Sequence, residues 1–264
     1  MITPFRLAKW YCDVLGGDGT LLIVMLGEVR LGGLRRARLA AELHRPDGTV
    51  VRDAVSLAHV RRTSGGCTFE AGGLEPGGLA WRAPGLSGSA RLAPRFPATT
   101  PADPLLSVGR RALRWTVEIP DADAEVELVW PGGRLALRGR AYRDRVLLDA
   151  MPWRLGLRRL TWGHAVFPTG AAWWLELATR RRTIAATWRN GVVSAGCTPP
   201  ALEPAPTLVD LRVADLPVLR IPPLGAAARW LAGDPHQQRW LARAGGHERG
   251  WSIHELVRWR AGET

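Results

Sequence analysis

The sequence predicts an all-β protein with a few short helices near its C-terminus. Short alternating or β-branched runs recur from one end of the chain to the other, as in residues 20–26, 37–44 and 114–119. Glycine, proline and aspartate separate these runs, which is typical of strands joined by tight turns. With 264 residues, of which 46% are hydrophobic, the chain can bury a sizeable core.

Four of the separating segments have the chemistry of hairpin turns. They lie at residues 16–19, 46–48, 131–133 and 190–191. The pair Asn190-Gly191 gives the strongest signal, because both residues tolerate the positive φ angles of a two-residue hairpin. We therefore expect residues 183–188 and 192–195 to pair. The turn at residues 131–133 also divides the chain into a predicted N-terminal domain, 1–130, and a C-terminal domain, 131–264.

Other segments depart from a plain strand pattern. Residues 85–104 are rich in proline, glycine, serine and alanine, which predicts a long loop that could cover a cavity. Residues 226–231 and 236–243 have helical spacing and predict two short helices. Residues 251–259 alternate again and predict a closing strand.

Composition excludes several functional classes. The net charge is +12, but Lys9 is the single lysine and the arginines are scattered along the chain, so we expect no nucleic-acid partner. Without a second lysine there is no phosphate-binding P-loop, and Schiff-base chemistry is not expected. Contact with a membrane surface through the arginines stays open.

The cysteines and the N-terminus indicate a cytoplasmic protein. Cys12, Cys67 and Cys197 are odd in number and far apart, so neither a disulfide framework nor a zinc knuckle is indicated. The first residues lack the apolar core of a signal peptide, and no run approaches the length of a membrane-spanning helix. The sequence does not predict an oligomeric state.

The two tyrosines of the chain both lie in polar clusters on predicted strands. Tyr11 is followed by Asp13, and Tyr142 by Asp144. Residues two apart on a strand point to the same side, so each pair could line a cavity wall. A carboxylate among aromatic residues loses hydration, which favours its protonated form for use as a general acid. The alternative is an ion pair with the neighbouring arginines on a sheet face.

A second cluster follows. Alternation places Trp162 and His164 on one face of a strand, where the histidine could orient a carbonyl or relay a proton; a satisfied core histidine is the commoner case. Asp149 is either a further carboxylate of the site or a turn former. The chain has 13 tryptophans, including Trp10 and Trp174; most should fill the core, while some could face a cation or a polyene.

The residues around both tyrosines carry a family resemblance. Tyr142-x-Asp144, then Asp149-Ala150 and Pro152, and then the run 162–165, resemble a sequence block of carotenoid 1,2-hydratases, the hydroxyneurosporene synthases. The run 10–13 is similar to the opening W-Y-x-D strand of that family, whose lipocalin-like relatives include intramolecular Diels-Alderases. This chain departs from the block at Val146, Leu148 and Leu160, where the family has asparagine, glycine and tryptophan.

The resemblance implies two lipocalin-like or barrel-sandwich units and a hydrophobic cavity. It makes Asp144 the acid and Asp149 a supporting carboxylate, and it adds Tyr142 and His164 to the catalytic set. The substrate-binding residues that it implies are Tyr11, Asp13, Trp10, Trp162 and Trp174. It implies no cofactor and no metal.

Three functions follow from this reading. The first is a hydratase that adds water to a carbon–carbon double bond of a carotenoid or another isoprenoid. The second is a cofactor-free cyclase that holds a polyene or polyketide in a reactive conformation. The third is a carrier that binds a hydrophobic ligand without changing it.

Overall fold

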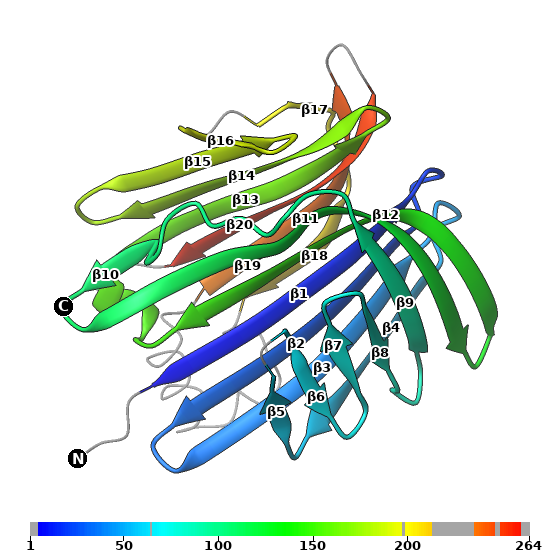
Figure 1. The fold of residues 1–264 in the computed structure, drawn as a ribbon, viewed down its shortest axis with the longest axis horizontal. Helices are drawn as coiled ribbons and strands as arrows, with labels where there is room; N and C mark the ends of the chain where they lie inside the picture. The colour runs from blue at the N-terminus through cyan, green and yellow to red at the C-terminus, as the bar shows by residue number, and fades with distance from the viewer. Residues whose placement is uncertain (1–4, 64, 197–198, 213–234, 246–248, 260–264) are drawn as a thin grey trace. The chain divides into compact units, whose positions relative to one another are not determined.

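The fold consists of two curled antiparallel sheets. The computed structural model describes residues 5–63, 65–196, 199–212, 235–245 and 249–259 (Figure 1). The strands of the first sheet are β1 (Arg6–Gly16), β2 (Leu21–Leu31), β3 (Leu34–His44), β4 (Val50–Leu57), β5 (Val60–Arg62), β6 (Cys67–Phe69), β7 (Gly72–Glu75), β8 (Gly78–Trp81), β9 (Ser87–Pro94), β10 (Leu106–Val108), β11 (Arg111–Trp130) and β12 (Gly133–Leu148). Their order is β4-β3-β2-β1-β12-β11-β9-β8-β7-β6-β5, and β10 pairs with β11.

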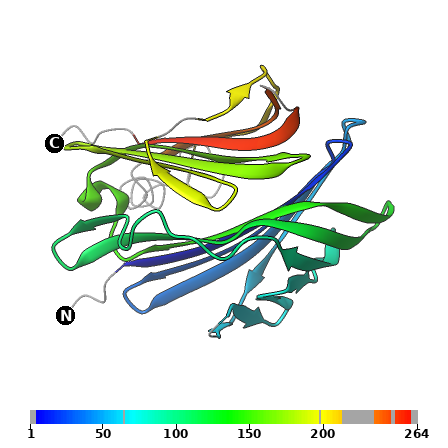
Figure 2. The ribbon, with the colours of Figure 1, turned by 45° about the horizontal axis from the view of Figure 1, so that its top comes forward.

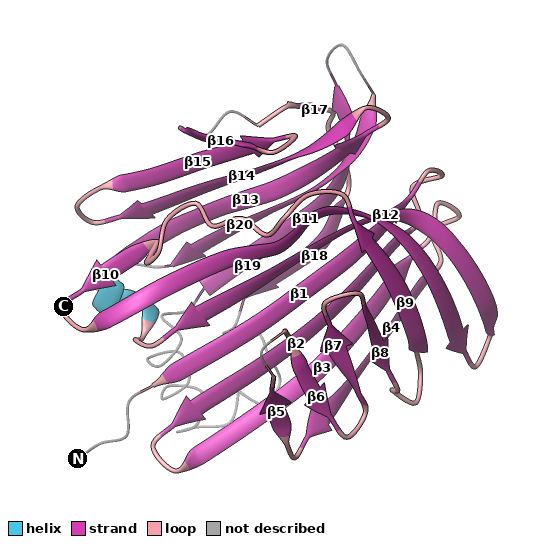
Figure 3. Ribbon diagram, in the orientation of Figure 1, coloured by secondary structure: helices cyan, strands magenta, loops and turns pink. Residues whose placement is uncertain are grey.

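The second sheet has the order β16-β15-β14-β13-β20-β19-β17, and β18 pairs with β19. Its strands are β13 (Leu157–Phe167), β14 (Gly170–Thr179), β15 (Thr183–Arg189), β16 (Val192–Ala195), β17 (Ala201–Leu202), β18 (Thr207–Arg212), β19 (Pro235–Gly245) and β20 (Gly250–Trp259). Among the described residues, the short 3-10 helix η1 (Pro152–Leu155) is the one helical element (Figure 3). The predicted all-β class is confirmed.

The chain forms two compact units that do not follow the predicted boundary. Unit 1 comprises residues 1–100 and 115–147, and unit 2 comprises residues 101–114 and 148–264. The turn at residues 131–133, where the sequence suggested a division, connects β11 to β12 within one sheet. Two long strands joined by a tight glycine-containing turn look the same in a sequence whether they join two domains or extend one sheet.

The core of unit 1 lies inside the curl of the first sheet. Even-numbered residues of β1, such as Trp10 and Cys12, pack there with Val24 of β2 and with Leu79 and Trp81 of β8. The short strands β5–β9 and the long strands β1–β4 thus contribute to one apolar cluster. Figure 2 shows the short strands, in teal, on one side of the long blue strands. The Trp81 indole also donates a hydrogen bond of 3.0 Å to the carbonyl oxygen of Leu86, which satisfies its buried N–H.

An ion-pair cluster links strands from distant parts of the first sheet. The buried carboxylate of Glu28 on β2 lies 2.5 Å from Arg35 Nε on β3 and 3.0 Å from Arg62 Nη2 on β5. Arg35 also donates to the carbonyl oxygen of Val60, at 2.6 Å. Because β5 ends the strand order, these contacts hold the free edge of the curl against β2 and β3.

The core of unit 2 contains an aromatic residue packed over a glycine. Trp174 of β14 belongs to a buried cluster with Ala165 and Phe167 of β13. Its ring lies over Gly163, where an added Cβ would clash with the indole and would lie 2.7 Å from the carbonyl oxygen of Ile253. The absence of a side chain at Gly163 therefore allows the indole to lie flat on the strand.

The hairpin predicted at Asn190-Gly191 is confirmed. It connects β15 to β16, with φ angles of 45° and 98° at the two turn residues. The Asn190 side chain also accepts a hydrogen bond of 2.8 Å from the backbone N–H of Ala171, which ties the turn to β14. The closing strand predicted at residues 251–259 is confirmed as β20.

Two local predictions were wrong. Within the segment predicted as a loop, residues 87–94 form β9, which pairs with both β8 and β11; its buried Ala90 and Leu92 alternate with exposed residues. Residues 236–243 are not helical but belong to β19, because pairing with β20 and β18 supplies their backbone hydrogen bonds. The helix predicted at residues 226–231 lies outside the described residues, and no described helix is long and apolar enough to cross a membrane.

The turn geometry predicts the effect of Gly191→Ala. A Cβ at a positive φ angle is strained, so we expect the free energy of unfolding to fall by about 1 kcal/mol. Gly33→Ala is the matched control, since that turn glycine has ordinary φ and open space around it. Urea unfolding of both variants checks this; equal effects of the two substitutions would refute the strain argument.

The Glu28 cluster predicts a pH-dependent contribution to stability. Burial alone raises the pKa of Glu28, but hydrogen bonds from Arg30 and Arg62 outweigh it and lower the pKa below the ordinary 4.5. A lowered folded-state pKa means that the stabilisation is present above the unfolded-state pKa and is lost as the pH falls through the folded-state pKa. We expect Glu28→Gln to cost about 1–3 kcal/mol at pH 7 and progressively less in acid, measured by urea unfolding across the pH range.

The control for Glu28 is an exposed ion pair on the same sheet. Glu125 lies 3.3 Å from Arg138, and both side chains are more than half exposed. We expect Glu125→Gln to change the free energy of unfolding by less than about 0.5 kcal/mol, both at pH 7 and in acid. A Glu28→Gln variant with the same small, pH-independent effect would show that the cluster does not hold the sheet edge.

Candidate active site

The predicted tyrosine–aspartate pairs lie on neighbouring strands of unit 1. Tyr11 and Asp13 occupy β1, Tyr142 and Asp144 occupy β12, and β1 pairs with β12 in the sheet order. All four side chains are buried. Since the even-numbered residues of β1 fill the core, alternation puts Tyr11 and Asp13 on the opposite face of the sheet.

A hydrogen bond joins Tyr142 to Asp144. The tyrosine hydroxyl donates to Asp144 Oδ2 at 3.1 Å, and each residue is 2% exposed. The rings of Tyr11 and Tyr142 lie 6.3 Å apart between centroids and are tilted by 60°. The structure thus brings one carboxyl group, one phenol donor and two aromatic rings together within unit 1, whereas the family resemblance had implied that Tyr11 and Asp13 would approach from the other unit.

The electrostatics of this group keep the phenol protonated. Burial, and next the negative charge of Asp144, raise the pKa of Tyr142 well above its ordinary 10. The hydroxyl of Tyr142 therefore stays protonated near neutral pH and can donate a hydrogen bond.

The arginines flanking Asp144 are engaged elsewhere. Arg143 Nε lies 3.0 Å from Glu118, and its Nη1 donates to the carbonyl oxygen of Glu75 at 2.5 Å. Arg145 lies 3.3 Å from the same Glu118. The ion pairs that the sequence left open for this segment thus form with Glu118 of β11.

A further ion pair lies beside the tyrosine–aspartate group. Arg140 of β12 donates to Asp121 of β11 through Nε at 2.7 Å and through a second, shorter contact from Nη2. Asp121 is fully buried. The sequence analysis did not select this pair, although Arg140 has the same strand parity as Tyr142 and Asp144.

Two other residues of unit 1, Trp10 and Cys12, are surrounded by the apolar core. Trp10 lies in the core cluster, on the opposite face from Tyr11. Cys12 lies there as well, and burial, followed by the charge of Asp13, raises the pKa of its thiol to about 12. A thiol that stays protonated is a poor nucleophile, so Cys12 is a core residue.

Asp149 belongs to unit 2 and anchors the backbone. One of its carboxylate oxygens accepts a short hydrogen bond from the N–H of Ala112, and the other lies 3.5 Å from Arg114 Nη1. Its side chain is 38% exposed. These contacts fix the residue after β12 to the start of β11, so Asp149 has a structural role there that differs from the turn former that the sequence offered as the alternative.

Trp162 and His164 share a buried face of the second sheet. On neighbouring strands, His164 lies opposite Trp173 and Ile253, and Trp162 lies opposite Leu175 and Glu255. The histidine is 1% exposed, and its backbone carbonyl accepts a hydrogen bond of 3.0 Å from Ser252 Oγ. Trp174, one position beyond Trp173, points to the other face, so the structure does not bring it together with Trp162.

A buried ion pair beside Trp162 escaped the sequence analysis. Arg239 of β19 donates to Glu255 Oε2 through Nε at 2.9 Å and through Nη2 at 2.8 Å, and both side chains are almost fully buried. Glu255 lies two residues from both Ile253 and Val257 on the closing strand, so alternation could have indicated that its carboxylate shares their buried face. The helical reading of residues 236–243 concealed its partner.

No metal site accompanies these groups in the part of the chain that the structure describes. There, no three His, Cys, Asp or Glu side chains are grouped so that they could hold a metal ion.

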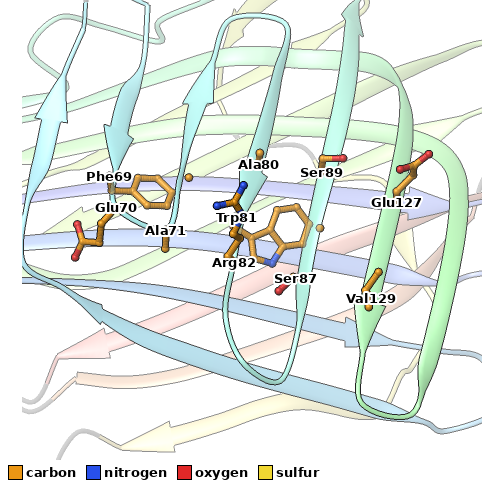
Figure 4. Close-up of a pocket in the computed structure, with 12 residues that line it drawn as sticks. Phe69, Glu70, Ala71, Ala80, Trp81, Arg82, Ser87, Ser89, Glu127 and Val129 are labelled. Atoms are coloured by element: carbon orange, nitrogen blue, oxygen red, sulfur yellow. The ribbon is translucent and has the colours of Figure 1, made fainter.

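Unit 1 also has an open hollow of about 510 Å³ over the short strands (Figure 4). Phe69 and Trp81 form part of its lining, together with Ser89 and Glu127. None of the four residues of the tyrosine–aspartate group lines it, so it is separate from the candidate site.

Comparisons with known proteins identify the architecture. The sequence matches no family model, and it has no significant similarity to a curated protein. The structure is similar to that of CghA in complex with Sch210972, with a TM-score of 0.64 and 14% identity over 98% of this chain and 90% of CghA. It is also similar to an ATTH-like protein of Nitrosomonas europaea, with a TM-score of 0.62 and 12% identity over 97% and 93% of the two chains.

A third solved structure is the kievitone hydratase of Nectria haematococca, with a TM-score of 0.55 and 9% identity over 96% of this chain and 88% of the hydratase. At these identities the likeness establishes the fold, and all three proteins have lipocalin-like folds. The chain accordingly has the lipocalin-like, all-β architecture that the sequence predicted.

Proposed function

We propose that this protein is a cofactor-independent hydratase that adds water to a carbon–carbon double bond of a hydrophobic, isoprenoid-like substrate. The observation that carries the proposal is the buried hydrogen bond from Tyr142 to Asp144 beside the ring of Tyr11. When Asp144 takes up a proton in these buried surroundings, it can pass that proton to an apolar substrate that offers no other site for acid catalysis.

The hydrogen bond defines the role of each group in the proposed step. Asp144 Oδ2 accepts from Tyr142, and the acidic proton would be carried on Oδ1. Transfer of that proton to one alkene carbon forms a new C–H bond and leaves a cation on the other carbon. The carboxylate formed on Asp144 is then stabilised by the phenol, which gives the hydrogen bond its largest effect in the transition state.

The two tyrosine rings suit the cation that forms next. The faces of aromatic rings attract positive charge. The ring centroids of Tyr11 and Tyr142 lie 6.3 Å apart, so both rings could lie close to one cation. Water adds to the cation and loses a proton, and return of a proton to Asp144 completes the cycle. Asp13, buried on the same face of β1, is the second carboxylate that we assign to this site.

The residues of unit 2 form a separate constellation. His164 and Trp162 lie on one buried face, with the Arg239–Glu255 pair beside Trp162. They take no part in the step proposed for unit 1, and a role for them in binding stays a prediction from the sequence. Asp149 and Trp174, whose contacts are structural, are left out of the proposed set, and so is Trp10.

Two structural neighbours support a small-molecule function for this fold. One of them hydrates kievitone, as its name states, and another was solved with the small molecule Sch210972. The proposal for the present chain rests on its own buried acid, since the likeness to these proteins extends to the fold alone.

A cyclase is the second candidate. It is favoured by the hydroxyl of Tyr142, whose raised pKa keeps it protonated near neutral pH, because such a donor, once turned from Asp144 to the substrate, can polarise a carbonyl without transferring a proton. In a cyclase the gain would come mainly from the conformation in which the polyene is held.

The first test is incubation with a lycopene-type acyclic carotenoid in heavy water, followed by mass spectrometry. A product heavier by one heavy-water molecule supports hydration. A product of unchanged mass but altered structure supports cyclisation, and recovery of the intact ligand in complex with the protein supports a carrier.

Asp144→Asn distinguishes a hydratase, which needs proton transfer from Asp144, from a cyclase, which acts mainly by holding the substrate in a reactive conformation. If Asp144 is the acid, the amide should reduce hydration by at least about 1,000-fold, whereas a cyclase would keep most of its rate. Asp123→Asn is the matched control, since this carboxylate on β11 is 65% exposed. Circular dichroism must show the same strand content in all three proteins, and full hydratase activity of Asp144→Asn would contradict the proposed acid.

Tyr142→Phe tests the phenol separately. It keeps the ring and removes the donor, so we expect kcat to fall by about 10- to 100-fold with a smaller change in KM. A variant in which KM rises while kcat stays unchanged would show that Tyr142 only binds the substrate.

A further inference from the structure

Unit 2 has a hollow of about 550 Å³ that none of the functional residues discussed above lines. Three elements form it: β10, the end of η1, and the turn between β14 and β15. β10 and η1 are in contact, and Figure 3 shows the helix beside that strand. Four arginines line the hollow: Arg154, Arg180, Arg181 and Arg182.

The backbone holds the turn that carries three of these arginines. Thr179 N–H donates to the carbonyl oxygen of Arg182 at 2.9 Å, and Thr179 Oγ1 accepts from the N–H of Arg182 at 3.0 Å. The N–H of Arg180 donates to the carbonyl oxygen of Gly156 at 2.9 Å, which ties the turn to the segment after η1. The turn geometry therefore leaves the guanidinium groups available for other contacts.

The positive charge of this hollow is not balanced by acidic residues in its lining. No aspartate or glutamate is among the described residues that line it. Within the described part of the chain, no carboxylate forms an ion pair with Arg154 or with the three arginines of the turn, whereas Arg159, further along β13, pairs with Glu176. Like charges gathered in a concave surface raise the local potential, and an anion entering the hollow offsets their repulsion.

The lining also has an apolar part. Leu106 and Leu155 are buried and form part of the wall, while Val108 is 49% exposed beside them. An anion that fills this hollow is therefore best matched by a compound with an apolar group next to its charge. Sulfate or chloride would leave the leucine and valine contacts unused.

We propose that this arginine pocket binds a phosphate monoester with a short apolar substituent. Guanidinium groups offer paired N–H donors that match phosphate oxygens, and several of them around one dianion add geometric selectivity. The apolar substituent lies against Leu106 and Val108. The pocket is independent of the proposed hydratase function, because it uses none of the residues assigned to that function.

The test is calorimetric titration of the full chain with n-butyl phosphate and with inorganic phosphate, at low and at physiological NaCl concentration. We expect saturable one-site binding, tighter for n-butyl phosphate, that weakens with salt. Arg154→Gln and Arg181→Gln should each weaken the binding of n-butyl phosphate by about tenfold. Absence of saturable binding, or equal affinity for both anions, would overturn the proposal.

A matched control separates a built pocket from general surface charge. Arg110 is an exposed arginine in the turn between β10 and β11 that does not line the hollow. Arg110→Gln should leave the affinity for n-butyl phosphate unchanged. If Arg110→Gln weakens binding as much as the lining variants do, the affinity depends only on the net charge of the protein and the pocket assignment is wrong.

Lipid vesicles supply the remaining arm of the experiment. Phosphatidylcholine vesicles with and without phosphatidylserine test whether the same arginines bind a membrane surface. We expect vesicle binding to be weak and to be displaced by n-butyl phosphate. Strong binding that requires phosphatidylserine and that n-butyl phosphate does not displace would show that the arginines contact a membrane, and it would overturn the small-molecule pocket.

Discussion

The pairing of β1 with β12 is the interaction on which the candidate site depends. It joins the two parts of the chain that carry the tyrosines, Tyr11 and Tyr142, and it does so in the middle of the first sheet. Because side chains alternate along a strand, the same register that puts Trp10 in the core puts Tyr11 on the opposite face. A slip of one residue would exchange the two sets and bury the carboxylates in the apolar core.

Both units hold charged groups at buried positions, which is costly unless each group has a partner. Asp121 is held by Arg140 in unit 1, and Glu255 by Arg239 in unit 2. Replacing such pairs with apolar residues is often neutral or stabilising in other proteins, so their presence is a weak argument for stability.

The fold class and the residues of the candidate site could be predicted from the sequence. The ion-pair and hydrogen-bond partners that come from distant strands could not. Alternation was sufficient to group Tyr142 with Asp144 and Trp162 with His164, because residues two apart on a strand share a face. It could not show that Arg143 and Arg145 would pair with Glu118, since that contact depends on which strand lies beside β12. The reading of residues 236–243 as a helix failed for the same reason, because the hydrogen bonds of β20 and β18 override local spacing.

The division of the chain between the units bears on how the protein can be dissected. Unit 2 takes residues 101–114 from between two parts of unit 1, and β11 begins in unit 2 and continues into unit 1. Neither unit is therefore a continuous piece of chain, and a fragment that begins at residue 148 lacks the β10 wall of the arginine pocket. Limited proteolysis, gene fusion and circular permutation would all have to respect this interleaved path, in which each unit completes its structure with residues encoded inside or beyond the other.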